Sequence, residues 1–252
     1  MSSADRSILD DYEAEQQELY GVLVDLDAEQ WLRPTPAAGW DVRDSVSHLA
    51  DTEEIAVDTA TGGPRALNEE AARYPTGDEF TLSGCLKGRA MAPAEVLDWW
   101  WSAAARTRST LASLPTDARI PWGLGMGWRA FVTARLMEHW AHGLDIKAAV
   151  GATRPDTDRL RHIAWIGVSA LPYAFGVAGV EPPAGHTLRV DLSGPDGKRW
   201  SFGQEDGTDR ISGPAAQWCR LAVQRIGLPD APDLVADGPL AALALGHARA
   251  FL

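Results

Sequence analysis

The sequence predicts an α+β fold in which a helical bundle precedes a small C-terminal α+β domain. Long segments within residues 1–181 repeat apolar side chains every three to four positions, as helices with one buried face do. After Pro182 and Pro183 the pattern changes, and apolar and polar residues alternate over 186–192 as in a strand. We therefore expect two domains, over residues 1–181 and 182–252.

The first two helices are predicted from their apolar spacing and from the residues that end them. A helix is expected over about residues 5–26, and the segment RPTPAAG over 33–39 separates it from the next. Asp41 predicts the N-cap of a second helix over about 42–60, which the pair Gly62 and Gly63 ends.

The next two helices follow a stretch that shows no period. Residues 64–92 are mixed and polar, so no element is assigned to them. Pro93 suits the first turn of a third helix, which runs to about Leu114. A Gly-rich connection over 119–128 leads to a fourth helix over about 129–150.

The rest of the chain predicts one more helix and then a mixed unit. A fifth helix fits 156–178, with a kink or break expected at Pro172. Three strands, joined by turns, and two helices are expected after it, over 186–192, 198–203, 206–212, 214–226 and 239–250.

Composition excludes several classes of function. The formal net charge is −12, and the excess of acids lies mainly in residues 1–150, which argues against nucleic-acid binding and against anionic membranes. The N-terminus is polar and no apolar stretch reaches membrane length, so we expect a cytoplasmic protein. Cys85 and Cys219 share no motif, which excludes a thiolate zinc site. The eleven tryptophans, Trp40 among them, are interpreted as core fillers rather than as an aromatic ligand cage.

The fourth helix carries the most informative residues. With about 100° per residue, His142 falls about 40° from Glu138 and Asp145 about 20° to the other side. Arg135 lies on the same face, and the other side of the helix is apolar, so its charges need partners in the interior. A metal bound by Glu138 and His142 is one solution. An ion pair of Glu138 with Arg135, beside a hydrogen-bonded core histidine, is the other.

A metal site needs a third ligand, and His48 on the second helix is the best candidate. It flanks the apolar stripe of that helix, although a lone histidine is also common as a half-exposed polar residue. His139 competes with it but points about 100° away from Glu138. Two histidines and a glutamate leave a coordination position open, which is the catalytic pattern for zinc, and they also suit nickel, iron or manganese.

Two motifs, GWDVRDSVSHLAD over 39–51 and R-x-x-E-x-x-x-H-x-x-D within 121–146, lie on the second and fourth expected helices. With them the sequence resembles the DinB-like superfamily and, within it, the mycothiol-dependent maleylpyruvate isomerase family, whose second and fourth helices carry motifs of this kind. The small domain that follows the bundle in these enzymes resembles RISGPAAQWCRLAVQR and LVADGPLAALALGHARAFL. The resemblance covers nearly the whole chain, but relatives of this architecture differ in their reactions, so it does not transfer maleylpyruvate as the substrate.

The resemblance implies a four-helix DinB-type bundle with metal ligands at His48, Glu138 and His142. It implies zinc, or another divalent metal such as nickel, and mycothiol as a cofactor whose sulfur binds the metal. Arg225 is the position that matches the family's active-site arginine in the C-terminal domain, and Arg220 is second. A solvated helix face is the alternative interpretation of both arginines.

Three functions follow from these expectations. The first is a zinc-dependent enzyme that uses mycothiol as a thiol transferase or cis–trans isomerase on a small electrophilic substrate. In it Asp145 orients a ligand and Arg225 contacts the thiol cofactor. The second is a metal-dependent hydrolase or lyase without a thiol, and the third is a non-catalytic ligand-binding bundle. The expected partners are a small substrate and a low-molecular-weight thiol, and a homodimer is compatible with the sequence.

Overall fold

The computed structural model describes residues 3–250, which divide into two compact units between Thr153 and Arg154. The division lies earlier than the boundary expected at 181/182. Helices α7 (Leu160–Ser169) and α8 (Leu171–Ala178), expected in the bundle, belong to the second unit.

The buried face of α7 explains the earlier division. The indole of Trp218 donates a hydrogen bond to the carbonyl oxygen of Ala164, and the thiol of Cys219 donates one to that of Leu160. Both donors belong to helix α9 (Ala215–Ala222) of the second unit. The expected helix over 156–178 is broken at Ala170, and Pro172 lies in the first turn of α8.

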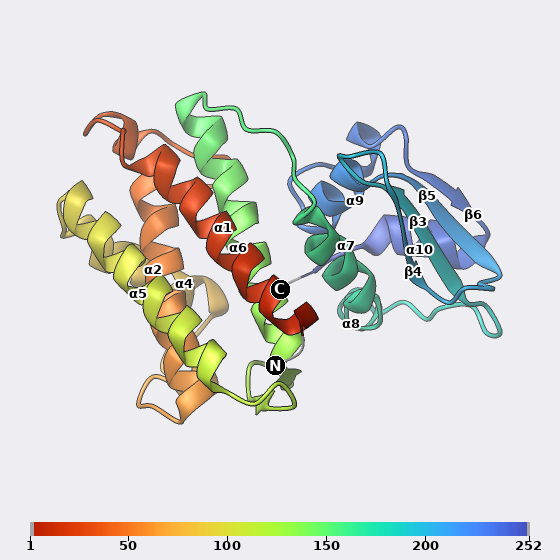
Figure 1. The fold of residues 1–252 in the computed structure, drawn as a ribbon, viewed down its shortest axis with the longest axis horizontal. Helices are drawn as coiled ribbons and strands as arrows, with labels where there is room; N and C mark the ends of the chain where they lie inside the picture. Colours follow the sequence, from red (N-terminus) through yellow and green to blue (C-terminus); the bar gives the residue numbers. More distant parts are fainter. Residues whose placement is uncertain (1–2, 251–252) are drawn as a thin grey trace. The chain divides into compact units, whose positions relative to one another are not determined.

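Four long helices form the first unit and lie side by side (Figure 1). They are α1 (Ser3–Leu23), α2 (Val42–Thr61), α5 (Pro93–Ser113) and α6 (Trp128–Val150), and all four were expected from the sequence. Helix α2 packs against α5 and α6, and α1 packs against α6. The apolar core between them includes fully buried side chains of every helix: Leu19, Leu23, Val46, Leu49, Trp100 and Ile146.

Local signals fix the ends of the two helices that carry the candidate ligands. Asp41 is the N-cap of α2, as predicted, because its carboxylate accepts a hydrogen bond from the Asp44 amide at 2.8 Å and Asp44 accepts one in return from the Asp41 amide. Gly62 ends α2 and Gly151 ends α6, both in the left-handed conformation that glycine adopts without strain. His48 therefore lies in the second turn of a helix with a fixed start.

The segment over 64–92 contains two helices that the sequence did not predict, α3 (Leu67–Ala71) and α4 (Gly77–Arg89). Helix α4 packs closely on α2 through two glycines. A Cβ atom on Gly88 would lie 2.6 Å from Ser47 Cβ, and one on Gly84 would lie 2.9 Å from Asp51 Cβ. Glycines, rather than an apolar stripe, make this contact, so hydrophobic periodicity gives no signal for α4.

The remaining elements are short connections and the sheet of the second unit. Helix η1 (Gln30–Leu32) follows α1, and strands β1 (Arg119–Ile120) and β2 (Met126–Gly127) form a hairpin before α6. The sheet has the order β4-β3-β5-β6, in which β3 is antiparallel to β4 but parallel to β5. Its elements are β3 (Leu188–Ser193), β4 (Arg199–Gly203), β5 (Asp209–Pro214), η2 (Leu228–Asp230), β6 (Val235–Asp237) and α10 (Pro239–His247).

Three of these strands and both helices, α9 and α10, were predicted, and β6 was not. Within residues 3–250, every helix is too short or too polar to span a lipid bilayer.

Candidate metal centre

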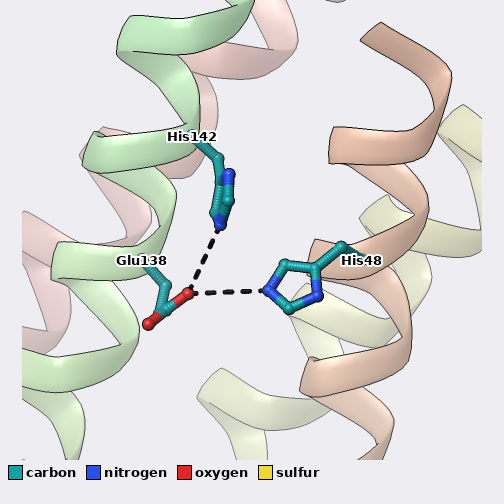
Figure 2. A group of neighbouring side chains, drawn as sticks. All are labelled: His48, Glu138 and His142. Atoms are coloured by element: carbon teal, nitrogen blue, oxygen red, sulfur yellow. Dashed lines mark ion pairs between the residues drawn. The ribbon is translucent and has the colours of Figure 1, made fainter. Parts of the chain in front are cut away.

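His48 from α2 and Glu138 and His142 from α6 form one cluster in the first unit. One ligand atom from each of the three lies within 4.8 Å of the others. Glu138 Oε2 is 3.7 Å from His48 Nε2 and 3.6 Å from His142 Nε2, and Figure 2 shows both imidazoles turned toward this oxygen. The structure thus brings together the three residues expected as ligands.

The helix geometry explains the convergence. Glu138 and His142 are one turn apart on α6, so their side chains leave the same face of the helix. The packing of α2 against α6 supplies the third side chain. The exposed fractions are 10% for the His48 side chain, 24% for Glu138 and 12% for His142, so the cluster is largely buried but open on one side.

Burial and neighbouring charges set the protonation of the cluster. Burial opposes the ionisation of Glu138, but the imidazoles of His142 and His48 and the charge of Arg135 hold its pKa well below the ordinary value. Burial lowers the pKa of His48. It also acts to lower that of His142, but the carboxylates of Asp145 and Glu138 outweigh it and raise the pKa. An ionised carboxylate thus faces two imidazoles, and protons compete with a cation for His142.

Asp145 lies behind His142 on the same helix. Its Oδ2 atom is 3.4 Å from His142 Nδ1, on the ring edge opposite the nitrogen that faces Glu138. The carboxylate is buried, while Nδ1 is not in a well-aligned hydrogen bond. Ligating histidines usually donate their second ring N–H to such a group, and the placement is the one expected for Asp145.

Trp40 is part of this site, although its type alone suggested a core filler. The residue is half-buried, and its indole lies nearly parallel to the His142 ring, with centroids 5.7 Å apart and an angle of 17°. Its centroid is also 5.0 Å from that of His48. The signal in the sequence that could have identified Trp40 is its position directly before Asp41, the N-cap of the helix that carries His48.

Arg135 has a partner that the sequence analysis did not consider. Its Nε atom lies 3.2 Å from Oε1 of Glu53 on α2, and both side chains are almost completely buried. The guanidinium also lies over the ring of Trp122, 5.1 Å from its centroid. The ion pair that Arg135 makes is therefore with Glu53, in place of the pairing with Glu138 that the sequence left open.

His139 lies in a separate polar pocket of the core and is not a third ligand of the cluster. The indole of Trp100 donates a hydrogen bond to His139 Nε2 at 3.1 Å, which leaves the proton on Nδ1 for the carbonyl oxygen of Arg135, 2.9 Å away. Burial lowers the pKa of His139 to about 4. His139 Nε2 therefore joins α6 to Trp100 of α5, while Nδ1 is satisfied within α6 itself.

Because His139 is buried in its neutral form, we expect the folded protein to lose stability in acid. Between pH 6.5 and 4 the unfolded chain binds a proton at His139 that the folded protein does not, so the unfolding free energy falls as the pH falls. The full effect is about 3 kcal/mol. Replacing His139 by glutamine removes the titration, and urea unfolding at pH 7 and 4.5 is expected to show a shallower pH dependence than in the wild type. An unchanged slope in the variant contradicts the prediction.

Arg225 and Arg220 belong to the second unit. Arg225 Nη1 donates a hydrogen bond to the carbonyl oxygen of Val223 at 2.9 Å. Arg220 forms a two-pronged ion pair with Asp156, with both nitrogen–oxygen distances 2.9 Å. A role for Arg225 at the cofactor stays a prediction.

The donor set suits a divalent transition metal. Two imidazole nitrogens and one carboxylate oxygen are ligands that zinc accepts, and three protein ligands leave a position for a small molecule. The largely buried setting, the converging Nε2 atoms and the carboxylate behind His142 fit such an ion.

The chain matches a known family model and a known protein sequence. A family model described as the mycothiol maleylpyruvate isomerase N-terminal domain matches residues 12–147. An uncharacterized protein of Mycobacterium tuberculosis, recorded from two strains, is 39% identical over 221 residues, which are 86% of this chain and 85% of that protein.

Solved structures show the same fold. The crystal structure of the mycothiol-dependent maleylpyruvate isomerase is similar with a TM-score of 0.61 at 17% identity, over 93% of this chain and 95% of that one. A mutant of that enzyme gives the same TM-score at 15% identity. Because the family model spans more than half of the chain and contains the whole His48–Glu138–His142 cluster, the chain belongs to the mycothiol-dependent maleylpyruvate isomerase family of the DinB-like superfamily.

Proposed function

We propose that this protein is a zinc-dependent enzyme that uses mycothiol for thiol transfer to, or cis–trans isomerisation of, a small electrophilic substrate. The observation that carries the proposal is the convergence of His48, Glu138 and His142 in a chain of this family. The choice of mycothiol rests on the family, which is that of the mycothiol maleylpyruvate isomerase N-terminal domain, and on the solved relative, which is mycothiol-dependent. Another divalent metal such as nickel has the same support from the ligands.

Each residue of the site has a distinct task in this proposal. His48 and His142 offer their Nε2 atoms, and ionised Glu138 offers its Oε2 atom and the negative charge that a cation requires. Asp145 accepts the second ring proton of His142 and so fixes which ring nitrogen is left for the metal. A metal held there would lower the pKa of a bound thiol so that it is a thiolate at neutral pH. Arg225 is proposed to contact the thiol cofactor.

Isomerisation and transfer differ in the fate of the thiol. In both, the thiolate sulfur adds to one carbon of an electrophilic double bond, whose π bond breaks and leaves its electron pair on the neighbouring carbon. In isomerisation the molecule rotates about the remaining single bond, the carbon–sulfur bond breaks and the double bond re-forms. In transfer the carbon–sulfur bond remains and the neighbouring carbon takes up a proton. A hydrolase or lyase on the same ligands would use no thiol, and a binding bundle would turn nothing over.

Turnover is expected to require both thiol and metal. Purified protein is incubated with maleylpyruvate and a panel of small electrophiles, with and without mycothiol, before and after a chelator and zinc restoration. We expect turnover only with both present, because the metal activates the thiol and the thiol is the nucleophile.

Each other outcome favours one alternative. Thiol-independent turnover that needs the metal indicates a hydrolase or lyase. Activity that survives complete metal removal overturns the metal-dependent mechanism, and a protein that takes up no metal favours the binding bundle. The cytoplasmic location and a homodimer stay predictions.

A further inference from the structure

Trp40 contacts both candidate histidine ligands, although they come from different helices. Its ring centroid is 5.7 Å from that of His142 and 5.0 Å from that of His48. The two imidazoles are themselves 4.9 Å apart at an angle of 64°. The indole therefore packs against a pair of rings that must keep a fixed mutual angle for their Nε2 atoms to face Glu138 Oε2.

The backbone of Trp40 is held in place by a short structured loop. Its carbonyl oxygen accepts hydrogen bonds from the amide of Thr35 at 2.8 Å and from the Thr35 hydroxyl at 3.1 Å. Its amide donates to the carbonyl oxygen of Ala37 at 3.0 Å, and Asp41, the next residue, caps α2. The indole is thus presented from a rigid point and not from a free loop.

The other contacts of the histidines do not fix the plane of both rings at once. Asp145 and Glu138 approach the edge of His142 at 3.4 and 3.6 Å, and neither contact is a well-aligned hydrogen bond, so these contacts hold the ring plane only loosely. A flat aromatic face against the imidazole restricts the tilt of the ring, and aromatic pairs at 4.5–7 Å are attractive beyond the area that they bury.

We propose that Trp40 is a positioning residue of the metal centre, whose indole fixes the ring planes of His48 and His142 for binding one divalent metal. The inference rests on the proposed metal site and adds a residue that contributes no ligand atom. Loss of the indole is expected to weaken metal binding about 10–100-fold, as loss of other groups that orient ligands does. A flat ring of smaller size is expected to preserve most of the affinity.

The test compares zinc affinity, measured by competition with a chromophoric chelator, in the wild type and three variants. Trp40→Leu keeps an apolar side chain without a flat face, and Trp40→Phe keeps a flat face. Trp101→Leu is the matched control, because Trp101 is also half-buried but packs against Tyr20, with ring centroids 4.6 Å apart. We expect weaker binding in Trp40→Leu alone, with Trp40→Phe near the wild type.

A second measurement reports the stacking without metal. In the metal-free protein the imidazole protons of His48 and His142 should show aromatic ring-current shifts by NMR that become smaller in Trp40→Leu, where only the mutual effect of the two imidazoles remains. Wild-type affinity in Trp40→Leu, or equal losses in the leucine and phenylalanine variants, overturns the inference while the metal site stands. A wild type that takes up no zinc overturns the proposed function, and this inference with it. Shifts of unchanged size in Trp40→Leu show that the indole does not stack on the imidazoles, and they overturn this inference alone.

Discussion

Replacing Glu138 or His142 by alanine is expected to leave the protein folded but without its metal. Each substitution removes one of the three proposed ligands, and Glu138 also supplies the negative charge of the cluster. Loss of a group that merely orients a ligand typically weakens binding about 10–100-fold, so loss of a ligand should cost at least about 100-fold. Elemental analysis of protein purified without chelator should give about one equivalent of zinc in the wild type and almost none in either variant.

Two further variants complete this comparison. Asp145→Asn keeps all three ligands and is expected to fall between the wild type and Glu138→Ala in affinity. His162→Ala, in the second unit, should retain full metal content. Stoichiometric zinc in both alanine variants would show that the metal is held elsewhere. Turnover with mycothiol should disappear in parallel with the metal.

Breaking the buried ion pair between Glu53 and Arg135 is expected to cause the largest loss of stability. Both side chains are almost completely buried, so removing one partner leaves an uncompensated charge in the core. Such a change costs about 3–5 kcal/mol. Chemical unfolding, monitored by the fluorescence of the buried tryptophans, should show a loss of this size in the unfolding free energy of Glu53→Leu and of Arg135→Met.

The double variant Glu53→Leu/Arg135→Met tests the cause of that loss. It removes both charges, and apolar replacements of a buried pair are often neutral or stabilising, so it should be more stable than either single variant. Arg106→Ala is the matched control, because Arg106 is 59% exposed where it pairs with Glu54 and should contribute less than about 1 kcal/mol. A double variant as unstable as the sum of the singles would mean that packing, and not charge, holds the pair.

The ligand cluster could be predicted because its signals are local. Glu138 and His142 share one face of α6, as their spacing in the sequence indicates. The N-cap Asp41 can be recognised in the sequence as the start of α2, and the spacing from Asp41 to His48 indicates on which face of α2 His48 lies. The pairing of the two helices was needed to join the three, and the family motif supplied it.

Other parts of the site depend on contacts that spacing does not encode. Glu53 lies between Leu49 and Ala56 on the apolar stripe of α2, so its burial could have been predicted, but its partner lies on another helix. The stacking of Trp40 depends on how a loop folds back at the start of α2. The compact units divide between Thr153 and Arg154, and Pro182 and Pro183, where the composition changes, lie in a loop of the second unit.

The close contact between α4 and α2 limits how freely the sequence of this protein can diverge. Ser47, which touches the space that a side chain on Gly88 would occupy, is the residue directly before His48. Any larger residue at Gly88 must push on the turn that carries a candidate ligand, although it lies outside the proposed metal cluster itself. The segment with the least regular pattern in the sequence therefore contains a position where we expect substitution to disturb the candidate site while His48, Glu138 and His142 are all still present.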